Sequence, residues 1–120
     1  MIEDPVPARP TAGERIIAAV TAWPGIEAGL GERGEFAFRV GGREIGHLHG
    51  NGAAHFFFPK PVWAELMAQG RITHHPVFPG APGPAAHRIK GDADVEAVIA
   101  LLRLNYDRFV TNVGGQATRA

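Results

Sequence analysis

A chain of 120 residues has the size of one folded domain, which buries roughly two-thirds of the surface that its unfolded chain exposes. Hydrophobic residues make up 45% of the sequence and charged residues 20%, as is typical of a globular protein. The 12 basic and 12 acidic residues cancel, so nucleic acid and an anionic membrane surface are not expected partners. The absence of cysteine excludes disulfides, zinc thiolates and a thiol nucleophile.

The first ten residues predict a flexible leader, because three prolines remove helix hydrogen bonds and little apolar surface is available for packing. They have neither the basic nor the apolar region of an export signal, and no apolar run approaches the ~20 residues of a membrane span. We therefore expect a cytoplasmic protein. A capping box from Thr11 to Glu14 then predicts the start of a helix, which ends near Pro24.

Alternating side chains predict an antiparallel meander in the middle of the chain. Residues 35–40 place their apolar side chains on one face, and Gly41-Gly42 is a two-residue link of the kind that tight hairpins prefer. The chain returns through residues 43–49, and a glycine-rich turn at residues 50–52 leads to a further strand over residues 53–58.

The second half of the chain predicts helices and short extended segments. Proline in the first turn and glycine at the end favour a short helix over residues 59–70. Residues 74–79 are expected to be extended, residues 80–84 to form a loop, and residues 85–90 to form one more strand.

A final helix begins at Asp92 or Asp94 and carries an apolar stripe as far as Phe109. The domain is therefore expected at residues 11–110, followed by a flexible tail at residues 111–120. This order of elements predicts a single α+β domain, a mostly antiparallel sheet with helices packed on one face.

Histidine carries most of the chemistry that could form a site. His47 and His49 are two residues apart on a predicted strand, so both rings project from the same face, with Cα atoms about 6.5 Å apart. The other histidines are His55, His74, His75 and His87. His74 and His75 precede a proline, so their backbone is biased to be extended and only one of the two rings can face a given pocket. The sequence contains no serine, which leaves acid, base and nucleophile roles to histidine and carboxylates.

The His-x-His pair has three interpretations. The rings can be half-buried and hydrogen-bonded to backbone carbonyls, they can hold one small ligand, or they can bind a zinc or iron ion. A catalytic zinc needs a third ligand, for which His55, His74 and His75 are the imidazole candidates. Glu44 is expected on the opposite face of the strand.

Three residues are candidates for binding a substrate. Arg43 could bind a carboxylate or an enolate in bidentate fashion, Tyr106 could present its hydroxyl at the edge of a pocket, and Phe57 could line a cleft. Each also has a structural interpretation, as a solvated charge, a packed helix residue and a core strand residue respectively.

Several motifs in order resemble the luciferase-domain family, over about residues 14–110. They are Gly42-Arg43-Glu44-Ile45-Gly46-His47-Leu48-His49-Gly50, Phe58-Pro59-Lys60, Gly70-Arg71, His74-His75, Asp94-Val95 and Leu101-Leu102-Arg103-Leu104-Asn105-Tyr106. The family includes the luciferase of luminous fungi. The resemblance implies an oxygenase that oxidises an enolic, pyrone-type substrate with molecular oxygen, without metal or flavin, and releases carbon dioxide.

The leading hypothesis is accordingly a small-molecule-binding protein of this family, acting as a cofactor-independent oxygenase through a histidine-lined cleft. Its expected catalytic residues are His47, His49, His74 and His75, and its expected substrate-binding residues are Arg43, Phe57 and Tyr106. A metal-dependent enzyme using His47, His49 and a third ligand is one alternative. A non-catalytic binding or interaction module is the other, and the sequence predicts no oligomeric state.

Overall fold

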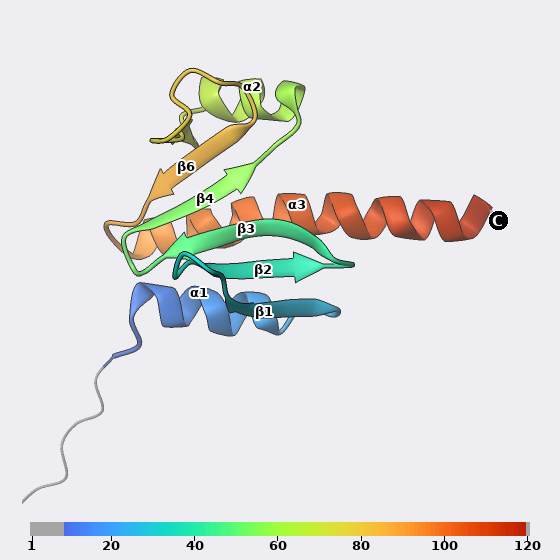
Figure 1. Cartoon of the computed structure of the whole chain (residues 1–120), viewed down its shortest axis with the longest axis horizontal. Helices are drawn as coiled ribbons and strands as arrows, with labels where there is room; N and C mark the ends of the chain where they lie inside the picture. The colour runs from blue at the N-terminus through green and yellow to red at the C-terminus, as the bar shows by residue number, and fades with distance from the viewer. Residues whose placement is uncertain (1–8, 120) are drawn as a thin grey trace, which may run out of the picture.

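The computed structural model of the protein describes residues 9–119, and for residues 112–119 it describes the backbone alone. Three helices and six strands lie within these residues (Figure 1). The helices are α1 (Ala12–Thr21), α2 (Lys60–Ala68) and α3 (Asp92–Arg119). The strands are β1 (Ile26–Leu30), β2 (Phe36–Val40), β3 (Arg43–His49), β4 (Ala53–Phe57), β5 (Thr73–His74) and β6 (Pro84–Arg88).

The six strands form one antiparallel sheet in the order β1-β2-β3-β4-β6-β5. Gly41 and Gly42 close the β2–β3 hairpin with φ angles of +58° and +77°, and a two-residue turn with both angles positive matches the twist of the strands that it joins. The glycine-rich turn at residues 50–52 closes the next hairpin and sets His47 opposite His55.

β3 contains a β-bulge at Ile45. Phe38 of β2 pairs with Gly46, but the next residue, Arg39, pairs with Glu44, so Ile45 has no partner on β2. An extra residue of this kind interrupts the alternation of side chains between the two faces of a strand.

The bulge exchanges the faces of the two charged residues that begin β3. Glu44 lies on the face of His47 and hydrogen-bonds its ring, which contradicts the expectation that Glu44 points to the opposite face. Arg43 instead lies on the helix face of the sheet, where its guanidinium carbon is 3.9 Å from the ring centroid of Phe109.

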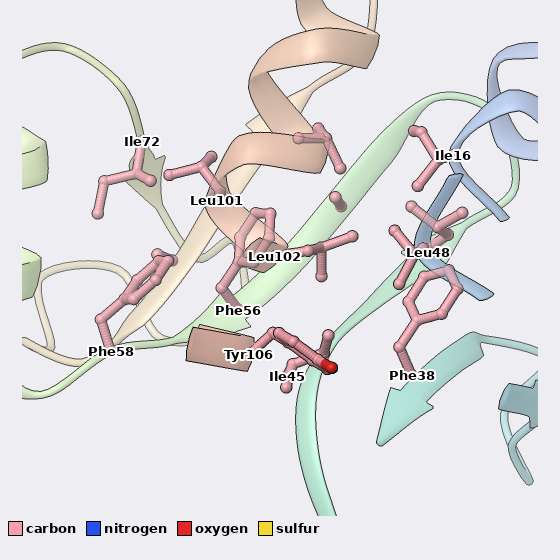
Figure 2. Packing of buried hydrophobic residues seen from close by; sticks show 14 of the residues in the cluster. Ile16, Phe38, Ile45, Leu48, Phe56, Phe58, Ile72, Leu101, Leu102 and Tyr106 are labelled. Carbon is pink, nitrogen blue, oxygen red and sulfur yellow. The ribbon is translucent and has the colours of Figure 1, made fainter. Parts of the chain in front are cut away.

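All three helices contribute side chains to one hydrophobic core on a single face of the sheet. Figure 2 shows this packing, with residues of α1, the strands and α3 meeting between the layers. α3 runs along the back of the sheet in Figure 1, and Leu102 of α3 packs against Gly46 of β3. A Cβ atom on Gly46 would lie 2.6 Å from Cδ2 of Leu102, so only glycine fits at this position.

The predicted α+β fold is confirmed, and so is the capping box of the first helix. The amide of Glu14 donates to Thr11 Oγ1 at 3.1 Å, and the amide of Thr11 donates to Glu14 Oε1 at 2.8 Å. β1 was not predicted. It is an edge strand in which only Ile26 is partly buried, so its sequence lacks the alternation that identifies a strand.

The structure describes most of the predicted C-terminal tail but little of the predicted N-terminal leader. Of the expected leader, residues 1–8 lie outside the described residues. The backbone of α3 continues to Arg119, so residues 111–119 of the predicted tail are helical, and residue 120 lies outside the described residues. Helical backbone hydrogen bonds need no apolar face, and no proline follows Pro84 to interrupt them. Within residues 9–119, no helix combines the length and the apolar character that a membrane crossing requires.

Candidate functional site

A pocket of about 680 Å³ opens on the face of the sheet opposite the core. β3 and β4 supply His47, His49 and His55, and the segment after β5 supplies His75. We call this cavity the histidine pocket. It is also lined by Glu32, Glu35, Glu44, Arg33 and Arg39, and by the apolar side chains of Leu30, Val77 and Phe78.

The four rings form one continuous cluster. The ring centroid of His47 lies 4.9 Å from that of His49 and 5.3 Å from that of His55. His55 is in turn 4.3 Å from His49 and 4.3 Å from His75. The shared face that the sequence predicts for His47 and His49 is therefore confirmed, and the pairing of β3 with β4 adds a third ring beside them.

Glu44 fixes the orientation and the tautomer of His47. The distance from His47 Nδ1 to Glu44 Oε2 is 2.9 Å. Because a carboxylate only accepts, the imidazole donates from Nδ1, and in the neutral ring Nε2 then carries a free lone pair. The hydrogen bond from His47 also lowers the pKa of the Glu44 carboxyl below its ordinary value, so Glu44 is ionised at neutral pH.

His55 is the most buried ring of the cluster, with 9% of its surface exposed. Burial, followed by repulsion from the neighbouring imidazoles, lowers the pKa of His55 from 6.5 to about 4. The ring is therefore neutral at physiological pH. Among the described side chains, neither His55 nor His49 makes a hydrogen bond, so their ring nitrogens remain available to a ligand.

His75 enters the pocket from a different part of the chain. Its Nδ1 accepts a hydrogen bond of 3.1 Å from the amide of Val77, so the neutral ring carries its proton on Nε2 and acts as a donor. Burial, and then the nearby His47 and His49, lower the pKa of His75.

His74 lies away from this cluster, on the helix side of the sheet. It pairs with Ala85, which belongs to the core, and its ring lies 5.9 Å from that of Trp63. The expectation that only one of the two adjacent histidines faces a given pocket is confirmed, and that residue is His75.

The three expected substrate-binding residues lie outside the lining of the histidine pocket. Arg43 stacks on an aromatic ring of α3 because of the bulge. Phe57 lies on the histidine face but further along β4, where it is 64% exposed. Tyr106 is buried in the core, and its hydroxyl donates to the carbonyl of Pro24 at 2.6 Å.

Pocket residues that were not among the expected catalytic and substrate-binding residues include His55, Glu44 and Arg39, although His55 was a candidate metal ligand. His55 could have been included, because a hairpin centred on Asn51 pairs position 47 with position 55. Glu44 reaches the pocket through the bulge, which no turn or alternation in the sequence announces. Arg39 instead follows from the regular alternation of β2, in which Phe38 faces the core and Arg39 faces the pocket.

The fold and the pocket define a small α+β protein with a cluster of imidazoles on the open face of its sheet. Residues 42–105, more than half of the chain, match the Luciferase domain family. The chain belongs to this family, and the resemblance seen in its motifs is confirmed. The matched segment runs from β3 to the middle of α3 and contains all four pocket histidines. No curated protein and no solved structure gives a significant match to the chain.

Proposed function

We propose that this protein is a luciferase-like oxygenase that binds a small enolic, pyrone-type molecule in the histidine pocket, ionises it and presents the anion to molecular oxygen. The observation that carries the proposal is the Glu44–His47 pair at the edge of a pocket lined by further imidazoles. Membership of the Luciferase domain family supports the reaction class.

His47 is the proposed general base. Glu44 holds the proton on Nδ1, so Nε2 can accept the acidic proton of an enol. The imidazolium that forms is then stabilised by the adjacent carboxylate, as in other carboxylate–histidine pairs. A positioned imidazole accepts such a proton directly, so the step requires no flavin or other organic cofactor.

His75 and Arg39 are the proposed partners of the substrate anion. Nε2–H of His75 is a neutral donor in the pocket, and Arg39 supplies a positive charge in its wall. Donors that are already oriented stabilise a developing negative charge without reorganisation. In this proposal they take the place of Arg43, which the sequence suggested as one candidate for binding the anion.

The size and the composition of the pocket suit a small organic ligand. A volume of about 680 Å³ lies within the range of small-molecule sites, which combine apolar walls with a few polar groups. Phe78 and Val77 provide such a wall beside the imidazoles. A flat, conjugated enol would pack against Phe78 while its oxygens meet the histidines.

Oxygen consumption tests the proposal. Purified protein is incubated with a panel of hydroxylated 2-pyrones while dissolved oxygen and released carbon dioxide are recorded. We expect turnover by the wild-type chain, and a loss of about 100-fold or more in His47→Gln, because the base is removed. Glu44→Gln, which removes the carboxylate that orients His47, should also lower the rate. Its matched control is Glu96→Gln, which changes an exposed carboxylate of α3. The proposal is wrong if the panel gives no uptake, or if His47→Gln and Glu44→Gln consume oxygen as fast as the wild type.

A further inference from the structure

His47, His49 and His55 have the arrangement of a three-histidine metal site. Each ring offers one nitrogen, and the three nitrogens all lie within 4.8 Å of one another. Two ligands of a tetrahedral ion at about 2.1 Å are separated by about 3.4 Å, so small ring rotations bring the three nitrogens to coordination distance. His49 is exposed and free of hydrogen bonds to the described side chains, and its ring can therefore turn at little cost.

The hydrogen bonds around the three rings leave the required lone pairs free. Glu44 binds Nδ1 of His47, which directs the lone pair to Nε2. Metal-binding histidines commonly donate their other ring N–H to a carboxylate, which fixes the ring and raises its basicity. His55 makes no hydrogen bond to the described side chains, so a ring nitrogen is free to bind a cation.

We propose that His47, His49 and His55 bind one divalent first-row transition-metal ion at the wall of the histidine pocket, with Glu44 as the positioning residue of His47. Three neutral imidazoles favour zinc, cobalt, nickel, copper or ferrous ions over magnesium and calcium, which prefer oxygen ligands. Three protein ligands leave further coordination positions open toward the pocket, as in catalytic rather than structural sites.

His75 is adjacent to this site without being a ligand. Its Nδ1 lone pair is used by the amide of Val77, so Nε2 holds the ring proton and cannot also bind a cation. The rings of His49 and His75 are equally close to that of His55, at 4.3 Å. Their hydrogen bonds differ, so His49 can act as a ligand and His75 as a hydrogen-bond donor. His75 is then placed to donate to a group bound at an open position of the metal.

This inference concerns the pocket of the proposed function but does not depend on the reaction. A bound ion would occupy the Nε2 lone pair of His47, so His47 would no longer be the base. The ion would instead favour loss of the proton from a coordinated enol to water and stabilise the enolate, and the substrate class would be unchanged. Metal binding is measured in the absence of any pyrone. Failure to bind metal therefore leaves the imidazole-based reaction standing, and metal binding without oxygen uptake rejects the reaction alone.

The experiment is a metal titration of the full chain after removal of metals with a chelator. Zinc binding is followed by calorimetry and cobalt binding by visible absorption, with magnesium as the comparison ion. We expect one zinc or cobalt ion per chain, nitrogen coordination in the cobalt spectrum and no heat with magnesium. His49→Ala changes an exposed ligand and should weaken binding by about 100-fold, and Glu44→Gln should weaken it by about 10- to 100-fold.

Two histidine variants are the matched controls. His74→Ala removes an imidazole from the helix side of the sheet, and His75→Ala removes the donor next to the site. Both should bind zinc within about two-fold of the wild type, because neither supplies a ligand. The metal site is rejected if wild-type protein binds no stoichiometric zinc or cobalt, or if His49→Ala binds as tightly as His74→Ala. Loss of binding in His75→Ala would reject the proposed ligand set.

Discussion

Glu44 and His47 share one face of β3 because the bulge at Ile45 lies between them. In a regular strand these two residues, three positions apart, would point to opposite faces, and Glu44 would face the hydrophobic core. An unpaired carboxylate there would be strongly destabilising. The bulge instead pairs Glu44 with a half-buried imidazole at 2.9 Å and leaves Ile45 in the core. One extra residue therefore both completes the core and orients the proposed base.

The close approach of α3 to the sheet predicts a large effect of a single added methyl group. In Gly46→Ala the new Cβ would lie 2.6 Å from Leu102 Cδ2 and 3.1 Å from the backbone oxygen of His55. We expect the free energy of unfolding to fall by about 1–3 kcal/mol, because the core must shift to relieve the overlap. Urea denaturation measures this change.

Gly52→Ala is the matched control for this substitution. A Cβ on Gly52 meets no heavy atom within 4 Å, so its stability should stay within about 0.5 kcal/mol of the wild type. Equal stabilities of the two variants would show that α3 does not pack against β3 as closely as described.

The parts of the fold that could be predicted from the sequence depend on local chemistry. The Gly41-Gly42 hairpin follows from the need for positive φ angles, and the helix start at Thr11 follows from its capping box. Both features are settled within four residues. The bulge at Ile45 instead lies against α3, where Asn105, 60 positions along the chain, donates to the carbonyl of Ile45, so no local pattern reveals it.

The candidate site also combines positions that follow from local sequence with positions that depend on distant parts of the chain. The common face of His47 and His49 follows from the strand period, and the turn at residues 50–52 determines the position of His55. His75 reaches the pocket through the pairing of β5 with β6, which consists of only two residue pairs. Its place therefore depends on the path of the chain through α2, and the sequence left His74 and His75 equivalent.

The carboxyl group of Asp94 predicts how stability changes in acid. The amides of Lys90 and Gly91 donate to it and His87 Nε2 lies 2.9 Å from it. The hydrogen bond from Lys90, followed by that from His87, lowers the pKa of Asp94 below its ordinary value of 3.8. A depressed carboxyl pKa stabilises the fold above the ordinary value, and this contribution disappears as the pH falls through the lower pKa of the folded state.

Asp94→Asn removes the titrating group and keeps an acceptor oxygen. The wild type should be more stable than this variant near pH 5, and the difference should shrink as the pH falls below 3.8 and through the lower pKa of the folded state. Denaturant unfolding across this range measures the difference. The same comparison with Asp107→Asn, which changes an exposed carboxylate paired with Arg103 at 2.8 Å, should give a smaller change with pH. A stability difference that is constant with pH would contradict the hydrogen-bonding role of Asp94.

The buried side chain of Asn105 should contribute to the free energy of unfolding, because it bonds the backbone at the bulge. Its side chain is 1% exposed, and Nδ2 donates to the carbonyl of Ile45 and to that of Phe57, both at 3.1 Å. Asn105→Leu keeps a similar volume but leaves both carbonyls without this donor, which should cost about 2–4 kcal/mol in unfolding free energy. Asp107→Asn, which breaks an exposed ion pair between Asp107 and Arg103, should change stability by less than about 1 kcal/mol.

Asn105→Leu also tests whether Asn105, rather than the rest of the core, maintains the bulge. Because Asn105 holds the carbonyl of Ile45, its loss should loosen β3 and weaken the hydrogen bond between Glu44 and His47. Nitrogen chemical shifts of the His47 ring report this directly, since a ring that is no longer held by a carboxylate populates both tautomers. Unchanged ring shifts in a destabilised Asn105→Leu protein would mean that the bulge is maintained by the packing of Ile45 and Gly46 alone.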